Sequence, residues 1–480
     1  MWLGIDIGTQ GVRAIVLDGS GNVVGRGSSP LRSMRRAGRH EQHPEHWWNS
    51  TAAACRQAMN SAGGKGPIWG IAVDSTSGTI AVLDGRGRPS GPGLMYDDAR
   101  ALSQSQRLGD QHRSWGQQMA VQASSPQAKM LWLAECGQVP PGYRFAHQAD
   151  CVTSKLVGGP VPSDSSHALK SGYDVVRCSW PENLEEIIGL RGSSLPKVVE
   201  PGTLLGLVDA EASEQSGIPP GTPVFAGMTD GCAGQISAAA LGHGDANSIL
   251  GTTLVIKASS QVLVEDPSGV LYSHRNPDGG WLPGGASNTG GRALAEAFPG
   301  ADLTSLDAAA AACEPASVVS YPLVGKGERF PFVAPDAEGF STGPPAGPTD
   351  HYAALLQGVA FVERLCYQRL QDLGVDLDGR LSFSGGATKS RYWCQLRADV
   401  LGRVAGIPSL PDPAAGMAIL AAWASGAYPS LGEAAADLVR FDAWIEPRTG
   451  AGELWTEPYE TFISALRERG WLPGAQESSG

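Results

Sequence analysis

The sequence predicts an α/β protein made of two similar domains. The chain has 480 residues, whereas a single hydrophobic core rarely grows beyond about 250–300 residues. Residues 5–14 read as a strand, a Gly-Thr turn and a returning strand, and residues 248–257 repeat this pattern half a chain later. Two copies of one strand-turn-strand opening indicate a duplication. We therefore expect one domain at residues 1–244 and a second at 245–480.

Apolar runs and turn residues define the opening elements. Residues 3–17 predict two strands around a glycine turn, and a third strand follows at 23–27. Pro44 opens a helix that runs to about residue 61, because proline fits the first helical turn. Residues 68–73 predict a buried strand, which ends in the polar run 74–79. The first domain is thus expected to open with strands and then a helix.

The charge balance excludes some partners. The formal net charge is −12 and the pI is about 5.3. An acidic protein is repelled by nucleic acids and by anionic membranes, so neither is expected as a partner. The only dense basic stretch, residues 32–39, contains four arginines and predicts a solvated loop.

The cysteines and the hydropathy indicate a reduced, soluble protein. The eight cysteines are scattered and form no C-x-x-C pair, which favours buried thiols in a cytoplasmic protein over a disulfide framework. We expect no leader peptide and no membrane span, since no apolar run reaches 18 residues. Residues 475–480 predict a disordered tail.

Two Gly-Thr turns are candidate phosphate sites. Residues 8–11 and 251–253 each end a strand and leave backbone N–H groups and hydroxyls that suit a phosphate oxygen. Asp6 precedes the first turn, where a carboxylate is useful only with a metal such as Mg²⁺ between it and the phosphates. Each turn alone also fits a structural role. The sequence has no G-x-x-x-x-G-K-[ST] motif, which excludes a P-loop protein.

Two further segments carry candidate chemistry. Asp230 follows the apolar strand 223–225 and precedes small residues at 233–240, so it fits either a helix N-cap or a general base. Residues 384–390 place Gly385 and Gly386 after another strand. Consecutive glycines there allow a purine or its phosphates to lie on bare backbone, and a tight strand-to-helix turn is the alternative.

Two other patterns are weak evidence for a functional site. His40, His43 and His46 cluster, but their order is not H-E-x-x-H, which disfavours zinc. Residues 285–291 lack the spaced glycines of a dinucleotide fingerprint, which disfavours a dehydrogenase. For Gly290 and its neighbour Gly291, a place beside a nucleotide is the better interpretation.

Taken together, these motifs resemble the FGGY family of carbohydrate kinases, within the actin–hexokinase–Hsp70 superfamily, over essentially the whole chain. The matching motifs are Asp6-Ile7-Gly8-Thr9 with Arg13, His43-Pro44 with Trp47-Trp48, Lys129-Met130-Leu131-Trp132-Leu133, Ala226-Gly227 with Asp230, Leu250-Gly251-Thr252-Thr253, and Gly385-Gly386-Ala387 with Trp393-Cys394-Gln395. A later family signature is only partly kept, at residues 354–359. The resemblance implies two actin-like, ribonuclease H-like α/β domains around a central cleft, sugar-binding in the first and nucleotide-binding in the second.

The resemblance also implies roles for single residues in an ATP- and Mg²⁺-dependent sugar kinase. Asp230 becomes the catalytic base, and Asp6 lies near the metal and the reacting hydroxyl. Ser77 joins these two aspartates in binding the sugar. The nucleotide would contact Gly8, Thr9, Gln10, Arg13, Gly251, Thr252, Thr253, Gly290, Gly291, Gly385, Gly386 and Ala387.

The sugar is expected to be a ketopentose. Xylulokinases of the family carry Gln-Met-His-Gly after the strand that here ends at Val73, whereas this chain continues with hydroxyl-rich residues at 75–79. That run and residues 163–174 look like the short D-ribulose kinases of cyanobacteria and plants. A polyol suits hydroxyl-bearing positions. D-ribulose is therefore the expected substrate, D-xylulose is the alternative, and a non-catalytic nucleotide-binding module of the actin–Hsp70 type is more remote.

The predicted reaction and fold imply motion. Phosphoryl transfer depends on positioning and on excluding water, so we expect the domains to close about a hinge near residue 245. The sequence leaves the oligomeric state open, with a homodimer among the alternatives.

Overall fold

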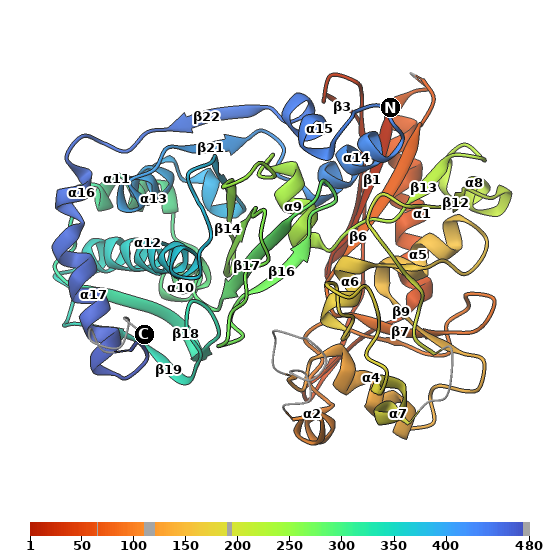
Figure 1. The fold of residues 1–480 in the computed structure, drawn as a ribbon. Helices are drawn as coiled ribbons and strands as arrows, with labels where there is room; N and C mark the ends of the chain where they lie inside the picture. The colour runs from red at the N-terminus through yellow and green to blue at the C-terminus, as the bar shows by residue number, and fades with distance from the viewer. Residues whose placement is uncertain (65, 110–120, 190–193, 474–480) are drawn as a thin grey trace. The chain divides into compact units, whose positions relative to one another are not determined.

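The computed structural model describes residues 1–64, 66–109, 121–189 and 194–473, and the predicted tail at 475–480 lies outside them. The chain forms two compact units (Figure 1). The first unit contains Met1–Leu241, His274–Gly280 and Leu410–Arg440; the second contains Gly242–Ser273, Trp281–Ser409 and the chain from Phe441 onward. The first change of unit thus falls beside the expected boundary at 244/245, but two later segments return to the first unit, which one boundary does not describe.

The first unit is built on a six-stranded sheet in the order β12-β13-β6-β1-β2-β3. The strands are β1 (Trp2–Ile7), β2 (Gly11–Leu17), β3 (Val23–Pro30), β6 (Gly70–Ser75), β12 (Leu204–Leu207) and β13 (Pro223–Phe225). β1, β6 and β13 are parallel, while β2, β3 and β12 run antiparallel to their inner neighbours. β1 and β6 are buried along their whole length, as their apolar runs predict.

The second unit repeats this topology. Its seven-stranded sheet has the order β16-β17-β15-β14-β20-β21-β22. The strands are β14 (Ala246–Leu250), β15 (Leu254–Ala258), β16 (Tyr272–Arg275), β17 (Trp281–Ser287), β20 (Leu381–Ser384), β21 (Ala405–Pro408) and β22 (Phe441–Ile445). β14, β20 and β21 are parallel, and β15, β17 and β22 are antiparallel to their neighbours, as in the first unit. β14 therefore corresponds to β1, and β20 to β6, which agrees with the repeat read from the sequence.

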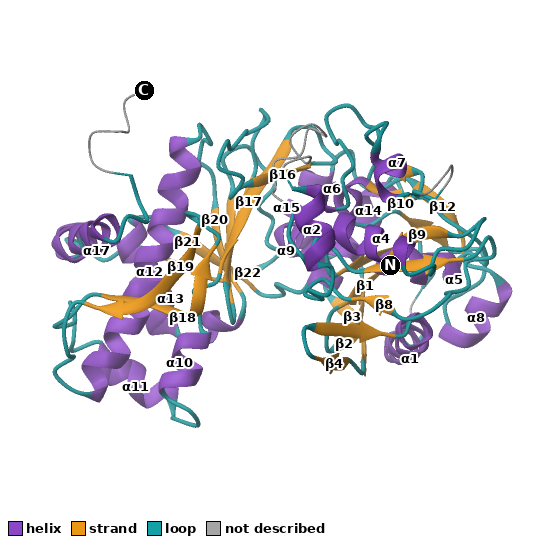
Figure 2. Ribbon diagram, turned by 90° about the horizontal axis from the view of Figure 1, so that it is seen from below, coloured by secondary structure: helices purple, strands orange, loops and turns teal. Residues whose placement is uncertain are grey.

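Helices flank the strands within each unit (Figure 2). In the first unit they are α1 (Pro44–Ala62), α2 (Leu102–Leu108), α4 (Pro126–Glu135), α5 (Gln148–Leu156), α6 (Ser165–Lys170), α7 (Leu184–Ile188), α8 (Ala210–Ser216), α9 (Asp230–Ser237), α14 (Pro413–Ala424) and α15 (Leu431–Leu438). This unit also has a sheet of β4 (Met34–Arg36), β5 (Arg39–Gln42), β8 (Gly93–Leu94), β7 (Ile80–Leu83) and β9 (Arg144–His147), and a pair of β10 (Ser163–Asp164) and β11 (Val198–Val199). The helix predicted from Pro44 is α1, which ends where Gly63 takes a left-handed conformation.

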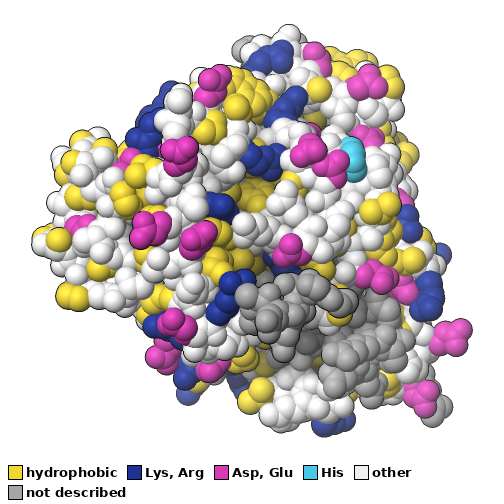
Figure 3. All heavy atoms as spheres, turned by 60° about the vertical axis from the view of Figure 1, so that its left-hand side comes forward, with side chains coloured by type: hydrophobic (Ala, Val, Ile, Leu, Met, Phe, Trp, Pro, Cys, Tyr) yellow, Lys and Arg dark blue, Asp and Glu magenta, His cyan; other side chains and the backbone are white. Residues whose placement is uncertain are grey.

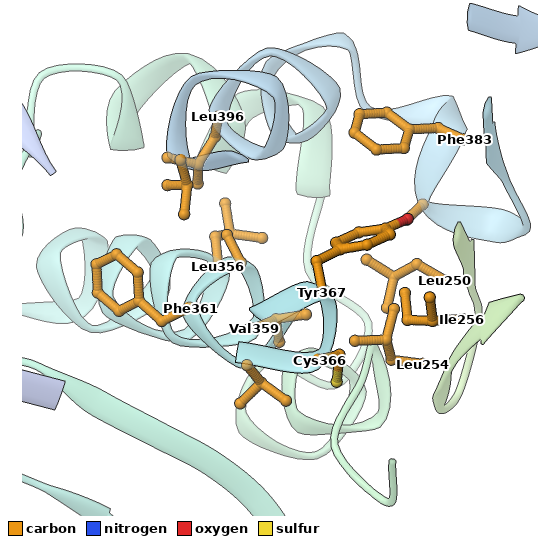
Figure 4. Close-up of a cluster of buried hydrophobic side chains, with 14 of the residues drawn as sticks. Leu250, Leu254, Ile256, Leu356, Val359, Phe361, Cys366, Tyr367, Phe383 and Leu396 are labelled. Atoms are coloured by element: carbon orange, nitrogen blue, oxygen red, sulfur yellow. The ribbon is translucent and has the colours of Figure 1, made fainter. Parts of the chain in front are cut away.

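The second unit has its own hydrophobic core around α12 (Pro348–Asp372). Phe361 and Leu356 of this helix pack with Leu396 and Phe383 from neighbouring elements (Figure 4). The other elements are α10 (Arg292–Ala297), α11 (Leu303–Ala310), α13 (Arg391–Leu401), α16 (Ala451–Leu454), α17 (Thr456–Glu468), the 3₁₀ turn η1 (Gly386–Lys389) and the pair of β18 (Ser320–Glu328) and β19 (Ala334–Ser341). None of the eight cysteines, all of which lie among the described residues, forms a disulfide.

α14 explains why Leu410–Arg440 belongs to the first unit. This helix is apolar on all sides and buried from Ala414 to Ala422, and it lies against β1 and α9. A Cβ atom on Gly4 of β1 would lie 1.7 Å from the carbonyl oxygen of Ala414, and one on Gly416 would lie 2.0 Å from that of Ala233. Only glycine allows the backbones to approach this closely. The contact holds the N-termini of α9 and α14 close to the end of β1.

The surface carries both signs of charge. On the face seen in Figure 3, Lys and Arg side chains are interspersed with Asp and Glu and form no large basic area. Among the described residues, no helix combines the length and the apolar character needed to cross a membrane.

Candidate active site

Two buried aspartates face each other at the ends of the central strands of the first unit. Asp6 on β1 is paired in register with Asp74 on β6, and their exposed fractions are 2% and 0%. Both follow apolar residues of parallel strands, whose carboxyl ends meet at one edge of the sheet. The register therefore brings two carboxyl groups together at the edge where α/β proteins bind their ligands.

Arg13 is the cation of this cluster. It lies on β2 opposite Asp6, and its Nε and Nη2 atoms lie 3.0 Å and 2.8 Å from Asp6 Oδ2. Its Nη1 atom lies 3.7 Å from Oδ2 of Asp412, the residue that caps the N-terminus of α14. One guanidinium thus connects the end of β1 to the start of a helix from far along the chain.

The cluster contains more carboxyl groups than the charge of one arginine can neutralise. Burial raises the pKa of Asp6 to about 6, against the lowering effect of Arg13, and the charges of Asp412 and Asp230 add to the rise. Burial, then the charge of Asp6, raises the pKa of Asp74 well above its ordinary value. Among the residues that the structure describes, none donates a hydrogen bond to either oxygen of Asp74. Because two ionised carboxylates repel, a proton on the more deeply buried Asp74, shared with Asp6, satisfies both groups.

Asp230 starts helix α9 beside this pair. Its neighbour Thr229 forms a bridge to Ser75, the last residue of β6, and the Thr229 N–H donates to Ser166 Oγ at 2.8 Å. Asp230 itself is half-buried, and its Oδ1 accepts from the Gly231 N–H at 2.7 Å. The charge of Asp230 acts on both buried aspartates. The predicted residues Asp6 and Asp230 are thus brought into one cluster, with a carboxylate of Asp230 open enough to meet a ligand.

The sequence interpretation missed two members of the cluster, Asp74 and Asp412. The polar run at residues 74–79 hides Asp74, although its place at the end of a buried strand resembles that of Asp6. Asp412 immediately precedes the apolar helix α14, Asp230 is the first residue of α9, and both aspartates open the sequence pattern D-x-x-A-G. That shared pattern was the available signal.

The hydroxyl-rich segment after β6 leaves one hydroxyl free of protein partners. Thr76 Oγ1 lies 2.7 Å from Thr79 Oγ1 and donates to Gln148 Oε1 at 2.7 Å. Ser75 Oγ lies 2.9 Å from a ring nitrogen of His167. By contrast, the buried Ser77 Oγ has no hydrogen-bond partner within the described part of the chain. Buried hydroxyls are normally bonded, so Ser77 is the member of this segment that is poised for a ligand.

A buried polar network holds the segment in place. His167 Nδ1 lies 2.6 Å from Asp164 Oδ2, and its Nε2 reaches Ser75. His147 lies 2.5 Å from Ser163 Oγ and 2.8 Å from Ser171 Oγ. Residues 163–174, which suggested the ribulose kinases, therefore form a scaffold that supports the ends of β6 and α9.

The first Gly-Thr turn adjoins the aspartates. The Gly8 N–H donates to the Gly11 carbonyl at 3.0 Å. The carbonyl of Thr9 accepts from Gln42 Nε2 at 2.8 Å, and that of Gln10 accepts from the Leu31 N–H at 2.9 Å. These bonds fix the turn without using the Thr9 hydroxyl. A phosphate role for Gly8, Thr9 and Gln10 stays a prediction.

In the second unit, the predicted nucleotide residues gather at one end of the sheet. Backbone N–H groups of Gly291 and Arg292 donate to the carbonyls of Gly251 and Thr252 at 2.8 Å and 3.2 Å. A Cβ on Gly290 would lie 2.6 Å from the Thr252 carbonyl oxygen. These contacts place the Gly290–Gly291 pair directly on the turn after β14.

The glycine loop after β20 meets the same turn. Gly385 has φ +86°, and a Cβ there would lie 2.5 Å from the Leu250 carbonyl oxygen. Its neighbour Gly386 has open space around its Cα, and Ala387 is buried in the 3₁₀ turn. The eight predicted residues Gly251, Thr252, Thr253, Gly290, Gly291, Gly385, Gly386 and Ala387 thus border the end of β14.

The residues present fit a cation only in part. Among the described residues, no group of three or more His, Cys, Asp or Glu side chains has the arrangement of a metal site. The buried oxygens of Asp74 without donors, and the excess of acid around Asp6, suit either a cation or a shared proton. Mg²⁺ typically binds one or two carboxylates and completes its shell with water and phosphate oxygens, so a single ligand such as Asp6 is sufficient.

The histidine cluster forms ordinary contacts. His40 lies between Asp97 Oδ1, at 2.5 Å, and Ser33 Oγ, at 2.9 Å. His43 caps α1 by accepting from the Glu45 N–H. His40 and His43 thus each have a partner within the protein.

Comparison of the sequence with known proteins finds relatives that are kinases. The chain is 26% identical to the autoinducer-2 kinase of Escherichia coli K12, over 97% of this chain and 94% of that protein. It is 29% identical to the xylulose kinase of Streptomyces rubiginosus over 58% of this chain and 59% of that protein. These relatives are kinases, and the match to the first extends along nearly the whole of both chains.

Solved structures share the fold. The xylulose kinase of Rhodospirillum rubrum superposes with a TM-score of 0.87 at 26% identity, covering 98% of this chain and 99% of that one. The glycerol kinase of Plasmodium falciparum with ADP has a TM-score of 0.84 at 18% identity, with 98% of each chain covered. The predicted fold of two actin-like α/β domains is thereby confirmed. The model of the FGGY N-terminal domain matches residues 1–237 and that of the C-terminal domain matches 246–425, so this chain belongs to the FGGY family of carbohydrate kinases.

Proposed function

We propose that this ATP-dependent sugar kinase phosphorylates a ketopentose, D-ribulose, at its terminal hydroxyl to give D-ribulose 5-phosphate. The observation that carries the proposal is the interaction of the Asp6 and Asp230 charges at the strand ends of the first unit. Ser77 follows β6 by two residues and offers a buried hydroxyl without a partner among the described residues. A half-buried carboxylate and a hydroxyl in the adjoining loop suit a polyol acceptor.

Asp230 is the general base in this proposal. The terminal hydroxyl of the sugar transfers its proton to the Asp230 carboxylate, and its oxygen bonds to the γ-phosphorus of ATP. The bond from that phosphorus to the bridging oxygen breaks, and ADP leaves with the electron pair. Asp230 is suited to this role because it is half-buried, whereas Asp6 and Asp74 are buried, and because it begins a helix.

Asp6 is the proposed magnesium residue. Its partly balanced, buried carboxylate favours a nearby cation, and Mg²⁺ would neutralise charge on the transferring phosphoryl group. Arg13 holds Asp6 in one orientation through its two contacts with Oδ2. In the second unit, Gly251, Thr252 and Gly385 are proposed to contact the phosphates and the adenosine.

The choice of sugar rests on the segment after β6. Relatives of this chain are named xylulose kinase and autoinducer-2 kinase, so D-xylulose is the second candidate. The hydroxyl-rich segment at residues 75–79 replaces the Gln-Met-His-Gly of xylulokinases and favours D-ribulose. A site built to bond a given hydroxyl rejects an analogue lacking it by a factor of about 10⁴–10⁵, whereas epimers are discriminated less sharply.

Steady-state kinetics on D-ribulose, D-xylulose and glycerol, with ADP release as the signal, tests the proposal. We expect the highest kcat/KM for D-ribulose and very little turnover of glycerol. A clear preference for D-xylulose would reject the ribulose assignment and leave the sugar kinase unaffected. Sedimentation of the same sample would test the homodimer, which stays a prediction.

A further inference from the structure

A lysine of the first unit is buried without a carboxylate partner. Lys129 on α4 has an exposed fraction of 0%. Its Nζ atom donates to the carbonyl oxygens of Gly78 and Met95, both at 2.8 Å. Within the described part of the chain it forms no salt bridge. Both bonds of this ammonium therefore go to the backbone.

The two carbonyls belong to two different loops. Gly78 lies in the loop between β6 and β7, directly after Ser77, and has φ +94°. Met95 follows β8, and its N–H donates to the His40 carbonyl. One side chain thus connects α4 to the loop that carries the unpartnered Ser77 hydroxyl and to the loop after β8.

Burying an ammonium group costs free energy of desolvation, so we expect the two hydrogen bonds of Lys129 to have a purpose beyond filling space. Burial lowers the pKa of Lys129 to about 7, while the nearby charges of Asp98 and Asp97 raise it and those of Arg100 and Lys170 lower it further. Methionine has a similar volume and would fill the same space without the desolvation cost. What methionine could not supply is a donor to two carbonyls at once. A lysine amine keeps at least two N–H donors whether it is charged or neutral, so it can serve both carbonyls in either form.

We infer that Lys129 is a positioning residue for sugar recognition, which fixes the backbone of Gly78 so that the Ser77 hydroxyl meets a hydroxyl of the ketose. The inference rests on the proposed function, because it names Ser77 as the sugar contact. Lys129 acts through the loop and does not itself touch the substrate. Its effect should therefore appear in the affinity for sugar and not in that for ATP.

Kinetics of Lys129→Met on the sugar that the wild type prefers tests the inference. We expect the KM for sugar to rise ~10- to 100-fold, as for the loss of two buried hydrogen bonds, with the KM for ATP within about twofold. Lys129→Gln keeps two N–H donors on a side chain one atom shorter, which cannot reach both carbonyls, so its sugar KM should fall between those of the wild type and Lys129→Met. It also serves if the methionine variant does not fold, and a sugar KM equal to that of the wild type would then reject the inference.

A control variant separates this role from general stability. Arg56 on α1 is exposed and also donates to two backbone carbonyls, those of Glu214 and Gln215 in α8. Arg56→Met removes the same kind of link and should leave the sugar KM within about twofold, with any loss confined to the melting temperature. A sugar KM that rises equally in both variants would assign Lys129 a structural role only.

A double-mutant cycle gives the decisive readout. If Lys129 acts through Ser77, then Ser77→Ala and Lys129→Met should be non-additive, and the double variant should be little worse in sugar kcat/KM than the poorer single one. Effects that multiply would overturn the inference. Wild-type protein without activity on any sugar would instead reject the proposed function, which is a different result from normal wild-type kinetics with an unaffected Lys129→Met.

Discussion

The two units share one topology but differ at the ends of their central strands. In the first unit, β1 and β6 pair Asp6 with Asp74; in the second, the corresponding strands β14 and β20 pair Ile249 with Ser384. One copy of the fold thus carries two buried acids where the other carries an apolar residue and a hydroxyl. Ser384 Oγ is satisfied by Asn247 Oδ1 at 3.0 Å, whereas Asp74 has no donor.

This difference separates two tasks that one fold can serve. Negative charge beside a strand end suits a proton acceptor or a cation, but it would repel the phosphates of a nucleotide. The second unit offers uncharged backbone and glycines at the same place, around Gly251 and Gly385. The same fold therefore places carboxyl groups at the ends of the central strands in the first unit and uncharged glycine backbone there in the second.

The largest expected effect comes from Asp230. Asp230→Asn should lower kcat by ~10²–10⁴, the usual cost of losing a general base, with ATP binding nearly intact. Steady-state kinetics and nucleotide titration measure the two quantities. Asp209, which caps α8 by accepting from the Ala212 N–H, is the control, since Asp209→Asn should keep its activity. More than about a tenth of wild-type turnover in Asp230→Asn would contradict the base assignment.

The second-largest expected effect comes from Gly385, in the glycine loop of the second unit. Gly385→Ala must place a Cβ 2.5 Å from the Leu250 carbonyl oxygen at φ +86°, so we expect the KM for ATP to rise about tenfold or more, with sugar affinity less changed. Gly374 has the same φ of +86° and open space around it. Gly374→Ala therefore carries the same backbone strain without the clash, and an equal rise in ATP KM there would contradict a nucleotide role for Gly385.

The smallest expected effect is a pH-dependent change in melting temperature when Asp74 is replaced. Because the folded pKa of Asp74 is raised, its carboxyl stabilises the fold below the unfolded pKa of about 4, and this contribution is lost as pH rises through the folded pKa. Asp74→Asn, which can donate an N–H to Asp6, should thus melt ~2–4 °C above the wild type at pH 8 but not at pH 4.

Thermal melts in metal-free buffer at several pH values measure this difference. At the corresponding position of the second unit, Ser384→Ala loses the bond to Asn247 and should lower the melting temperature by a similar amount at every pH. A pH-independent difference for Asp74→Asn would show that Asp74 carries no shared proton in the folded protein.

Sequence analysis could locate site residues that lie in short motifs, but it could not predict contacts between residues that are distant in the sequence. The two Gly-Thr turns and Asp230 lie within short, readable strand-turn motifs, so their positions could be read directly. Asp412 could not be placed, because its contact with Arg13 depends on a helix almost four hundred residues away returning to β1. The buried bonds of Lys129 were equally hidden, since a K-x-x-W-L motif says nothing about which carbonyls its lysine meets.

The return of α14 also has a consequence for synthesis. A ribosome releases the chain from its N-terminus, so β1 is made about four hundred residues before α14 (Pro413–Ala424), the helix that covers Gly4. While the intervening residues are translated, this central strand lacks that cover, and chaperones or partner segments would have apolar surface to bind.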